Sequence, residues 1–235
     1  MENLSMATNV YWGFINWRKS PDCVNAIINK FNLTKGDYSI DLPSHKTDNR
    51  GNSYNSLIEY AKISGRRYLV ICHDDVIIDD DNVINEYIDF MQLFKQKIMT
   101  FGFGSNNRVM NGIIPNPLLE VNYCGTTFNV VRFPGNDLIV IDMEGGVLPF
   151  RTDINAMHVD IWLWENYKAG NLLKFGMFFD IKDSWKKISL NKTREHITKF
   201  AEADYNNAIK IASANFELCN NPIELKEALK ELINE

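Results

Sequence analysis

Residues 68–76 (Tyr-Leu-Val-Ile-Cys-His-Asp-Asp-Val) constrain the fold of this chain more than any other stretch. Five mostly apolar residues run directly into His73-Asp74-Asp75. An uninterrupted apolar run of this length is typical of a strand that is buried on both faces of a largely parallel sheet. Ligands of open α/β sheets bind beyond the carboxyl ends of such strands. The acidic cluster is therefore a candidate ligand site.

The residue types in this cluster suit a divalent cation. Carboxylate oxygens are hard ligands of the kind that Mg²⁺ and Mn²⁺ take in proteins, and these cations usually hold substrate phosphates as well. An alternative interpretation is that the acids only cap the helix that follows, because Asp is common at such junctions. A second acidic run, Asp79-Asp80-Asp81, precedes a predicted helix, so we interpret it as a capping cluster.

Strands and helices alternate around the central stretch, which predicts an α/β fold with helices flanking the sheet. Ser20-Pro21-Asp22 is a strong helix start, with a cap, a proline at the first helical position and an acid in the first turn. Predicted strands cover residues 9–16, 38–41, 98–103, 122–131 and 138–143. Predicted helices start at Ser20, run from about 54 to Gly65, from Asp81 to about 97, and through Met157 to about Gly170.

The pattern weakens beyond Phe179, where the chain is polar and predicted to be mainly helical. We expect helices around 193–213 and from Pro222. The predicted organisation is a polar leader at 1–8, one catalytic domain at 9–190, and a C-terminal helical extension at 191–235 that packs on the same domain.

Composition excludes several classes of protein. The chain has 235 residues, 45% of them apolar, and a formal net charge of −5, which gives no general attraction to nucleic acid. Its four cysteines lie far apart without a Cys-x-x-Cys spacing, which favours reduced thiols in a cytoplasmic protein over a zinc ribbon. No apolar stretch reaches the length of a transmembrane helix.

Several familiar catalytic motifs are absent, but polar residues recur at the ends of the predicted strands and at helix starts. The chain has no Gly-Lys-Ser/Thr phosphate loop, no His-Glu-x-x-His and no Gly-x-Ser-x-Gly. In order along the chain stand Asn16, Asp41, Asn49-Arg50-Gly51, Asn55, His73-Asp74-Asp75, Gly145-Gly146 and Asp160.

This ordered set resembles the GT-A glycosyltransferases, and family 2 of that class in particular, over roughly residues 9–180. The resemblance implies a GT-A-like, Rossmann-related mixed sheet with a C-terminal helical tail. It also implies transfer of a sugar from a nucleotide-diphosphate donor, UDP-linked, to a glycan or lipid-linked hydroxyl acceptor, as in polysaccharide biosynthesis. A metal ion assists, Mn²⁺ or Mg²⁺, and the transfer inverts the anomeric centre.

The resemblance also implies roles for particular residues of the donor site. Phe14, Asn16 and Asp41 would hold the nucleotide base. The remaining donor-site residues are the pocket residues Asn49 and Asn55, then Asp74 toward the ribose or sugar, and Gly146.

Metal binding and base catalysis are implied for other positions. Asp75 would ligate the metal beside His73, which stands where many members of the family have the first Asp. Asp160 would be the catalytic base, although His158 replaces the acid found two residues earlier in the family. The third metal ligand has no clear match, and Asp180, Asp183 and His196 are all candidates.

Two other functions remain open at this point. A nucleotidyltransferase also places acids around Mg²⁺ at a strand end, but residues 12–16 offer no basic residue for a triphosphate. A nucleotide- or carbohydrate-binding domain without catalysis is the non-enzymatic alternative.

Overall fold

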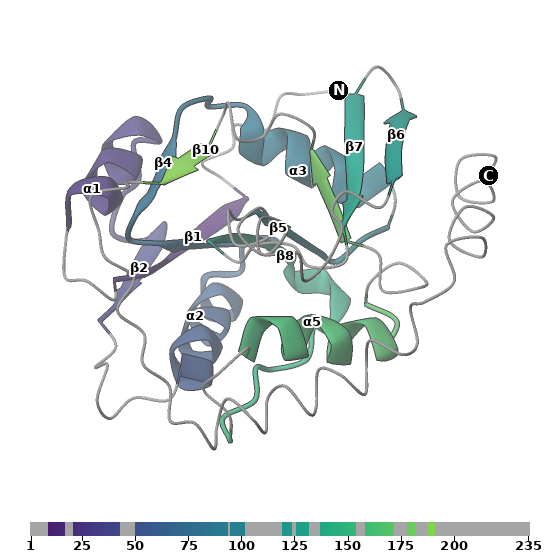
Figure 1. Ribbon diagram of the computed structural model, residues 1–235. Coiled ribbons are helices and arrows are strands. Elements are labelled where there is room, and N and C mark those ends of the chain that lie inside the picture. Colours follow the sequence, from purple (N-terminus) through teal and green to yellow (C-terminus); the bar gives the residue numbers. More distant parts are fainter. Residues whose placement is uncertain are drawn as a thin grey trace, which may run out of the picture.

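A five-stranded sheet in the order β2-β1-β3-β8-β5 forms the centre of the molecule (Figure 1). The computed structural model describes residues 9–16, 21–42, 50–93, 95–101, 119–123, 126–131, 137–153, 158–171, 178–181 and 188–190. The strands of the central sheet are β1 (Val10–Ile15), β2 (Tyr38–Asp41), β3 (Tyr68–His73), β5 (Ile98–Phe101) and β8 (Leu138–Asp142).

Only β8 runs against the other strands of this sheet. β1 pairs in parallel with β2 and with β3, whereas β8 pairs antiparallel with β3 and with β5. The sheet is therefore mixed, and the predicted α/β fold is confirmed. The carboxyl ends of β1, β2 and β3 and the amino end of β8 consequently lie at the same end of the sheet.

Alternate residues of the central strands pack into two separate cores. In β3, Tyr68, Val70 and Cys72 join one apolar cluster, and Leu69 and Ile71 join the other. This alternation is the period of two that every strand imposes on its side chains. Because both faces are apolar, each must be covered, and the predicted strand buried on both faces is confirmed.

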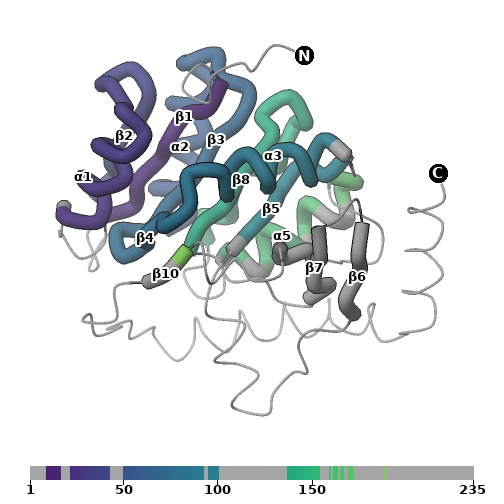
Figure 2. Tube along the Cα trace, turned by 90° about the horizontal axis from the view of Figure 1, so that it is seen from above, coloured from purple at the N-terminus to yellow at the C-terminus, as the bar shows by residue number. Residues whose placement is uncertain are grey.

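Helices cover both faces of this sheet (Figure 1). The first face carries α1 and α3, with α1 beside β4 (Val76–Ile78) and α3 over β8 and β5 (Figure 2). The second face carries α2 and α5. Their bounds are α1 (Pro21–Lys30), α2 (Arg50–Ser64), α3 (Val83–Leu93) and α5 (His158–Lys168).

A glycine lets α2 approach the sheet closely. A Cβ added at Gly13 of β1 would lie 2.9 Å from Cδ1 of Leu57. Real Cβ atoms essentially never come that close, so a larger residue at position 13 would force the side chain of Leu57, or α2 itself, to shift. The close contact also positions Tyr54 of α2, whose hydroxyl lies 2.7 Å from Nε2 of His73 at the end of β3.

The later part of the chain differs from the prediction. Beyond Phe179 a mainly helical chain is predicted, but the structure has strands at β9 (Phe178–Ile181) and β10 (Ile188–Leu190). β10 pairs antiparallel with β4 (Val76–Ile78), and Ile188 becomes fully buried in this contact. A short strand of this kind depends on a distant partner, which the local pattern of residues 188–190 does not reveal.

The remaining strands form a small separate sheet. β7 (Thr126–Val131) pairs with β6 (Leu119–Tyr123) and with β9, antiparallel in both cases. The predicted hairpin strand at 122–131 is thus two strands. The predicted leader at 1–8 and extension at 191–235 lie outside the described residues. Within the described part of the chain, no helix is long and apolar enough to cross a membrane.

Candidate functional site

Four strands deliver polar residues to one end of the central sheet, which we call the site end. The register aligns Ile15 of β1 with both Asp41 of β2 and His73 of β3. The backbone N–H of His73 donates to the carbonyl of Asp137, just before β8, at 2.9 Å. Residues that leave these strands are therefore brought together, as expected for the carboxyl ends of parallel strands.

Three side chains at the site end form a compact group of metal-binding donors, which we call the cation cluster. His73, Asp75 and Asp137 each offer one donor atom, and these atoms all lie within 4.8 Å of one another. His73 Nδ1 and Asp137 Oδ1 are 3.8 Å apart. Both aspartates are buried, with 2% of Asp75 and 8% of Asp137 exposed. Carboxylates removed from water need a compensating charge, and this cluster could hold a metal ion.

Tyr54 of α2 contacts the other nitrogen of His73. Its Oη lies 2.7 Å from His73 Nε2. Burial raises the pKa of Tyr54 well above its usual value, so the hydroxyl stays neutral and is able both to donate and to accept a hydrogen bond. The histidine is thus fixed from the side of the ring that faces away from Asp137.

Asn16, Asp41 and Asp74 also lie at the site end, as the sequence predicts. The N–H of Asn16 donates to the carbonyl of Asp41 at 2.9 Å, and the N–H of Asp74 donates to the carbonyl of Ile15 at 3.1 Å. Asp74 is fully buried, whereas Asp41 is half-buried. Asn16 is buried, and its Oδ1 has no hydrogen-bond partner among the described residues.

Phe14, predicted to hold the nucleotide base, and Asn55, predicted to line the nucleotide pocket, make contacts elsewhere. The ring of Phe14 is fully buried in the core, where it packs between Trp12 and Tyr38. The side-chain amide of Asn55 donates to the carbonyl of Phe150 at 2.9 Å and accepts from its N–H at 2.7 Å. Asn55 therefore clamps the backbone that follows β8.

Gly146 is not brought together with the other predicted residues. It follows β8, which runs toward the opposite end of the sheet, where Asp142 aligns with Tyr68. Gly146 has a φ of 66° and ends the short 3₁₀ helix η2 (Met143–Gly145), so a turn explains this glycine. Asn49, Asp183 and His196 lie outside the described residues. Asp180 lies on β9, opposite Asn129.

Asp160 lies in the first turn of α5, and the direction of this helix can be read from its ends. Beyond its last residue, the carbonyl of Asn171 accepts a hydrogen bond from the N–H of Lys97, which precedes β5. Since β5 starts at the end of the sheet opposite the site end, α5 finishes there and begins toward the site end. The backbone of Asp160 is therefore on the side of the cation cluster, and its side chain lies outside the described residues.

Asp137 is the residue of the cluster that the sequence did not single out. It directly precedes the strand predicted at 138–143, and we expected site residues after the predicted strands. An antiparallel strand contributes the residue before it, not the residue after it, to the site end. An isolated acid immediately before a buried strand is the signal that could have identified it.

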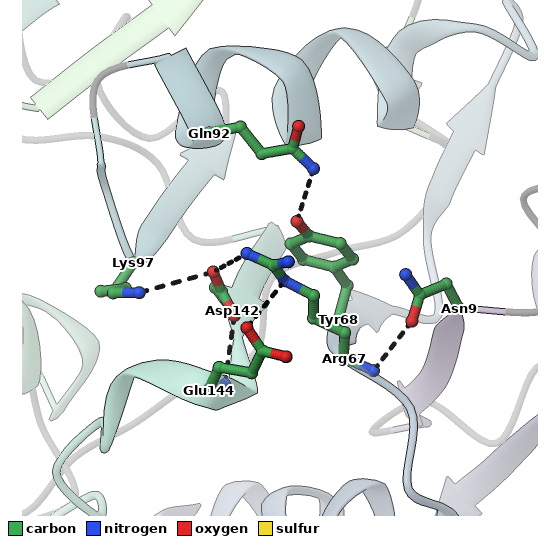
Figure 3. A network of polar contacts seen from close by, with 7 residues as sticks. All are labelled: Asn9, Arg67, Tyr68, Gln92, Lys97, Asp142 and Glu144. Carbon is green, nitrogen blue, oxygen red and sulfur yellow. Dashed lines mark hydrogen bonds and ion pairs between the residues drawn. The ribbon is translucent and has the colours of Figure 1, made fainter. Parts of the chain in front are cut away.

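The opposite end of the sheet, which we call the paired end, carries a network of ion pairs (Figure 3). The buried carboxylate of Asp142 lies 3.2 Å from a terminal nitrogen of Arg67 and 3.6 Å from Nζ of Lys97. It also accepts the N–H of Glu144 at 3.1 Å. The hydrogen bond to Asp142 raises the pKa of Arg67. Glu144 pairs with Arg67 as well, so this acid is not at the site end.

Comparison with known proteins does not identify the function of this chain. No family model and no curated protein matches the chain. Among solved structures, the crystal structure of A197 from STIV is 11% identical and covers 83% of this chain and 98% of that chain, with a TM-score of 0.46. A likeness at this level carries no argument about activity.

Proposed function

We propose that this protein is a cation-assisted glycosyltransferase that uses a nucleotide-diphosphate sugar, in particular a UDP-sugar. The observation that carries the proposal is the convergence of His73, Asp75 and Asp137 at the end of the sheet where Asn16 and Asp41 also lie. This places a candidate cation site beside two residues that leave neighbouring parallel strands, which is where α/β proteins bind nucleotides.

The donor set of the cation cluster fits Mn²⁺ or Mg²⁺. It combines two carboxylates with one imidazole, and the imidazole favours Mn²⁺ over the harder Mg²⁺. A bound cation of this kind supplies Lewis-acid stabilisation of a diphosphate leaving group. The residues of the chain hold the cation in place and keep water from part of it, since both carboxylates are buried.

We propose that Asn16 and Asp41 bind the nucleotide half of the donor. Asp41 is half-buried at the end of β2 and offers a carboxylate to the N3–H of uracil. Asn16 supports this assignment because its buried Oδ1 has no hydrogen-bond partner among the described residues. A site that is built to bond a particular group rejects bases that lack it, so we expect UDP to bind more tightly than CDP or GDP.

The chemical step requires a base for the acceptor hydroxyl. Asp160 is our candidate, because α5 begins on the side of the cation cluster and Asp160 lies in its first turn. A positioned carboxylate takes the proton as the hydroxyl attacks the anomeric carbon, and a single displacement inverts that centre. The acceptor that we propose is a glycan or a lipid-linked hydroxyl. We also propose a cytoplasmic location, where a thiol such as that of Cys72 stays reduced.

The test is turnover of a panel of nucleotide sugars with Mn²⁺ and with EDTA. We expect release of UDP from one UDP-sugar that depends on Mn²⁺ and increases with an acceptor. Release of pyrophosphate from a nucleoside triphosphate would instead identify a nucleotidyltransferase. Tight, Mn²⁺-dependent UDP binding without turnover of any donor would identify a binding domain.

A further inference from the structure

His73 has two ring nitrogens, and the structure gives them different surroundings. Nδ1 faces the cation cluster, where Asp137 Oδ1 lies 3.8 Å away. Nε2 faces α2, where Tyr54 Oη lies 2.7 Å away. A neutral imidazole that binds a cation through one nitrogen carries its proton on the other. If Nδ1 binds the cation, then Nε2–H needs an acceptor on the side of α2.

We propose that Tyr54 is a positioning residue for the cation cluster, whose hydroxyl oxygen accepts the Nε2–H of His73 and so keeps Nδ1 turned toward Asp75 and Asp137. The inference rests on the cation site of the proposed function but not on glycosyl transfer. Histidines that bind metals generally donate their other N–H to such a partner, and loss of the partner typically weakens metal binding.

The surroundings of Tyr54 suit a residue that must hold one position. Its ring lies against the ring of Phe150, with centroids 4.5 Å apart, and Phe150 stacks on Trp162 of α5 at 4.0 Å. Asn55, the next residue of α2, bonds both the N–H and the carbonyl of Phe150. The indole N–H of Trp162 donates to the carbonyl of Leu148 at 2.5 Å. The rings of Phe150 and Trp162 and the backbone clamp therefore hold the ring of Tyr54 in place.

The contact between the hydroxyl of Tyr54 and Nε2 of His73 is largely buried, so its loss should cost binding energy at the cation site. Tyr54 is fully buried and His73 largely so. When a buried N–H loses its acceptor, water does not readily replace the lost hydrogen bond. Tyr54→Phe removes the oxygen and keeps the ring that packs on Phe150. The substitution should therefore weaken the cation site more than it weakens the fold.

The experiment measures the affinity of the whole protein for Mn²⁺ alone by calorimetry, with the unfolding temperature measured in parallel. We expect Tyr54→Phe to weaken Mn²⁺ binding about 10- to 100-fold. The matched control is Tyr68→Phe, because Tyr68 is a buried tyrosine at the other end of β3 whose hydroxyl accepts from Gln92 at 2.8 Å. Its Mn²⁺ affinity should equal that of the wild type.

A second pair of variants separates positioning from general damage. In a His73→Ala background, Tyr54→Phe should cause no further loss of Mn²⁺ affinity, because its effect acts through the imidazole. A further loss in that background would overturn the proposal, as would wild-type Mn²⁺ affinity in the single Tyr54→Phe variant.

A measurement on the unmutated protein covers the case in which Tyr54→Phe fails to fold. Nitrogen-15 NMR of labelled histidine, with Zn²⁺ as a diamagnetic probe, should show His73 Nε2 protonated and Nδ1 bound. Zn²⁺ on Nε2 would refute the proposal.

Mn²⁺ binding that depends on Tyr54 without turnover of any nucleotide sugar would uphold this inference and refute the proposed function. A wild-type protein that binds no Mn²⁺ would refute both.

Discussion

At the paired end of the sheet, the carboxylate of Asp142 lies against the cationic groups of Arg67 and Lys97, whereas at the site end Asp75 and Asp137 lie beside an imidazole. Strands β3 and β8 contribute to both ends. Arg67 directly precedes β3 and His73 ends it, whereas Asp137 directly precedes β8 and Asp142 ends it.

The two ends differ in the groups that lie beside their buried carboxylates. The carboxylate of Asp142 lies against two cationic side chains, so its burial needs no ligand. The cation cluster places two buried carboxylates and one imidazole within 4.8 Å of one another, an arrangement that a divalent cation would stabilise. Identical substitutions at the two ends should therefore have different consequences.

The largest effect is expected for Asp75→Asn. The amide keeps nearly the same volume and removes the charge, so the fold should persist while Mn²⁺-dependent UDP binding is lost. The loss should exceed the ~10–100-fold that changes around a metal site typically cause. Calorimetry with UDP in the presence and absence of Mn²⁺ measures it, and Asp142→Asn is the matched control at the paired end. Undiminished Mn²⁺-dependent affinity in Asp75→Asn would remove Asp75 from the cation cluster.

The next effect concerns the chemical step at the site end. Asp160→Asn should lower kcat by about 10²–10⁴-fold, the usual contribution of a general base. Donor affinity should stay close to that of the wild type, because a base that acts only during attack does not contribute to donor binding. The measurement is kcat together with the donor Kd. A near-normal kcat would exclude Asp160, and Asp153 would then be the next acid to test, since Glu144 lies at the paired end.

The two ends also differ in how far the sequence predicts them. The run of apolar residues into His73-Asp74-Asp75 is a local pattern, so the strand, its burial and most of the cation cluster could be predicted. The same local reasoning identified Asn16 and Asp41, because each directly follows or ends a predicted strand. These residues lie at one end of the sheet, as predicted, because β1 and β2 run parallel to β3.

The paired end and Asp137 depend on contacts between distant parts of the chain. Arg67 and Asp142 are 75 residues apart and meet because β8 is antiparallel to β3. The sequence does not reveal that direction. The resemblance implied Gly146 for the donor site, whereas the antiparallel β8 places Asp137 at the site end and Gly146 away from it. Asn55 was likewise expected in the nucleotide pocket, but its amide pairs with Phe150, which is 95 residues away.

A moderate effect on stability is expected at the paired end. Asp142→Asn should lower the free energy of unfolding by about 1–2 kcal/mol, because charged hydrogen bonds are lost while Arg67 and Lys97 remain partly hydrated. Mn²⁺ affinity should not change. Urea denaturation and calorimetry on the same variant test both halves. A loss of Mn²⁺ affinity in this variant would show that the two ends of the sheet are coupled and not separate.

The smallest effect concerns Asp37, a second acid at the paired end, which precedes β2. Its carboxylate accepts from the backbone N–H of Thr34 at 2.8 Å and from its hydroxyl at 2.6 Å, and pairs with Arg66 at 2.7 Å. The hydroxyl of Thr34 is the main cause of a lowered pKa of Asp37, and Arg66 adds to it. A carboxylate whose pKa is lower in the folded than in the unfolded protein stabilises the fold above the unfolded pKa. This contribution is lost as the pH falls from about 4 through the folded pKa.

Asp37→Asn should therefore lower the free energy of unfolding by about 0.5–1.5 kcal/mol at pH 7, and the difference from the wild type should shrink as the pH falls toward 3. Urea denaturation at a series of pH values measures this difference, with the exposed Asp89→Asn on α3 as the control. A difference that is the same at pH 7 and at pH 3 would show that the charge of Asp37 does not stabilise the fold.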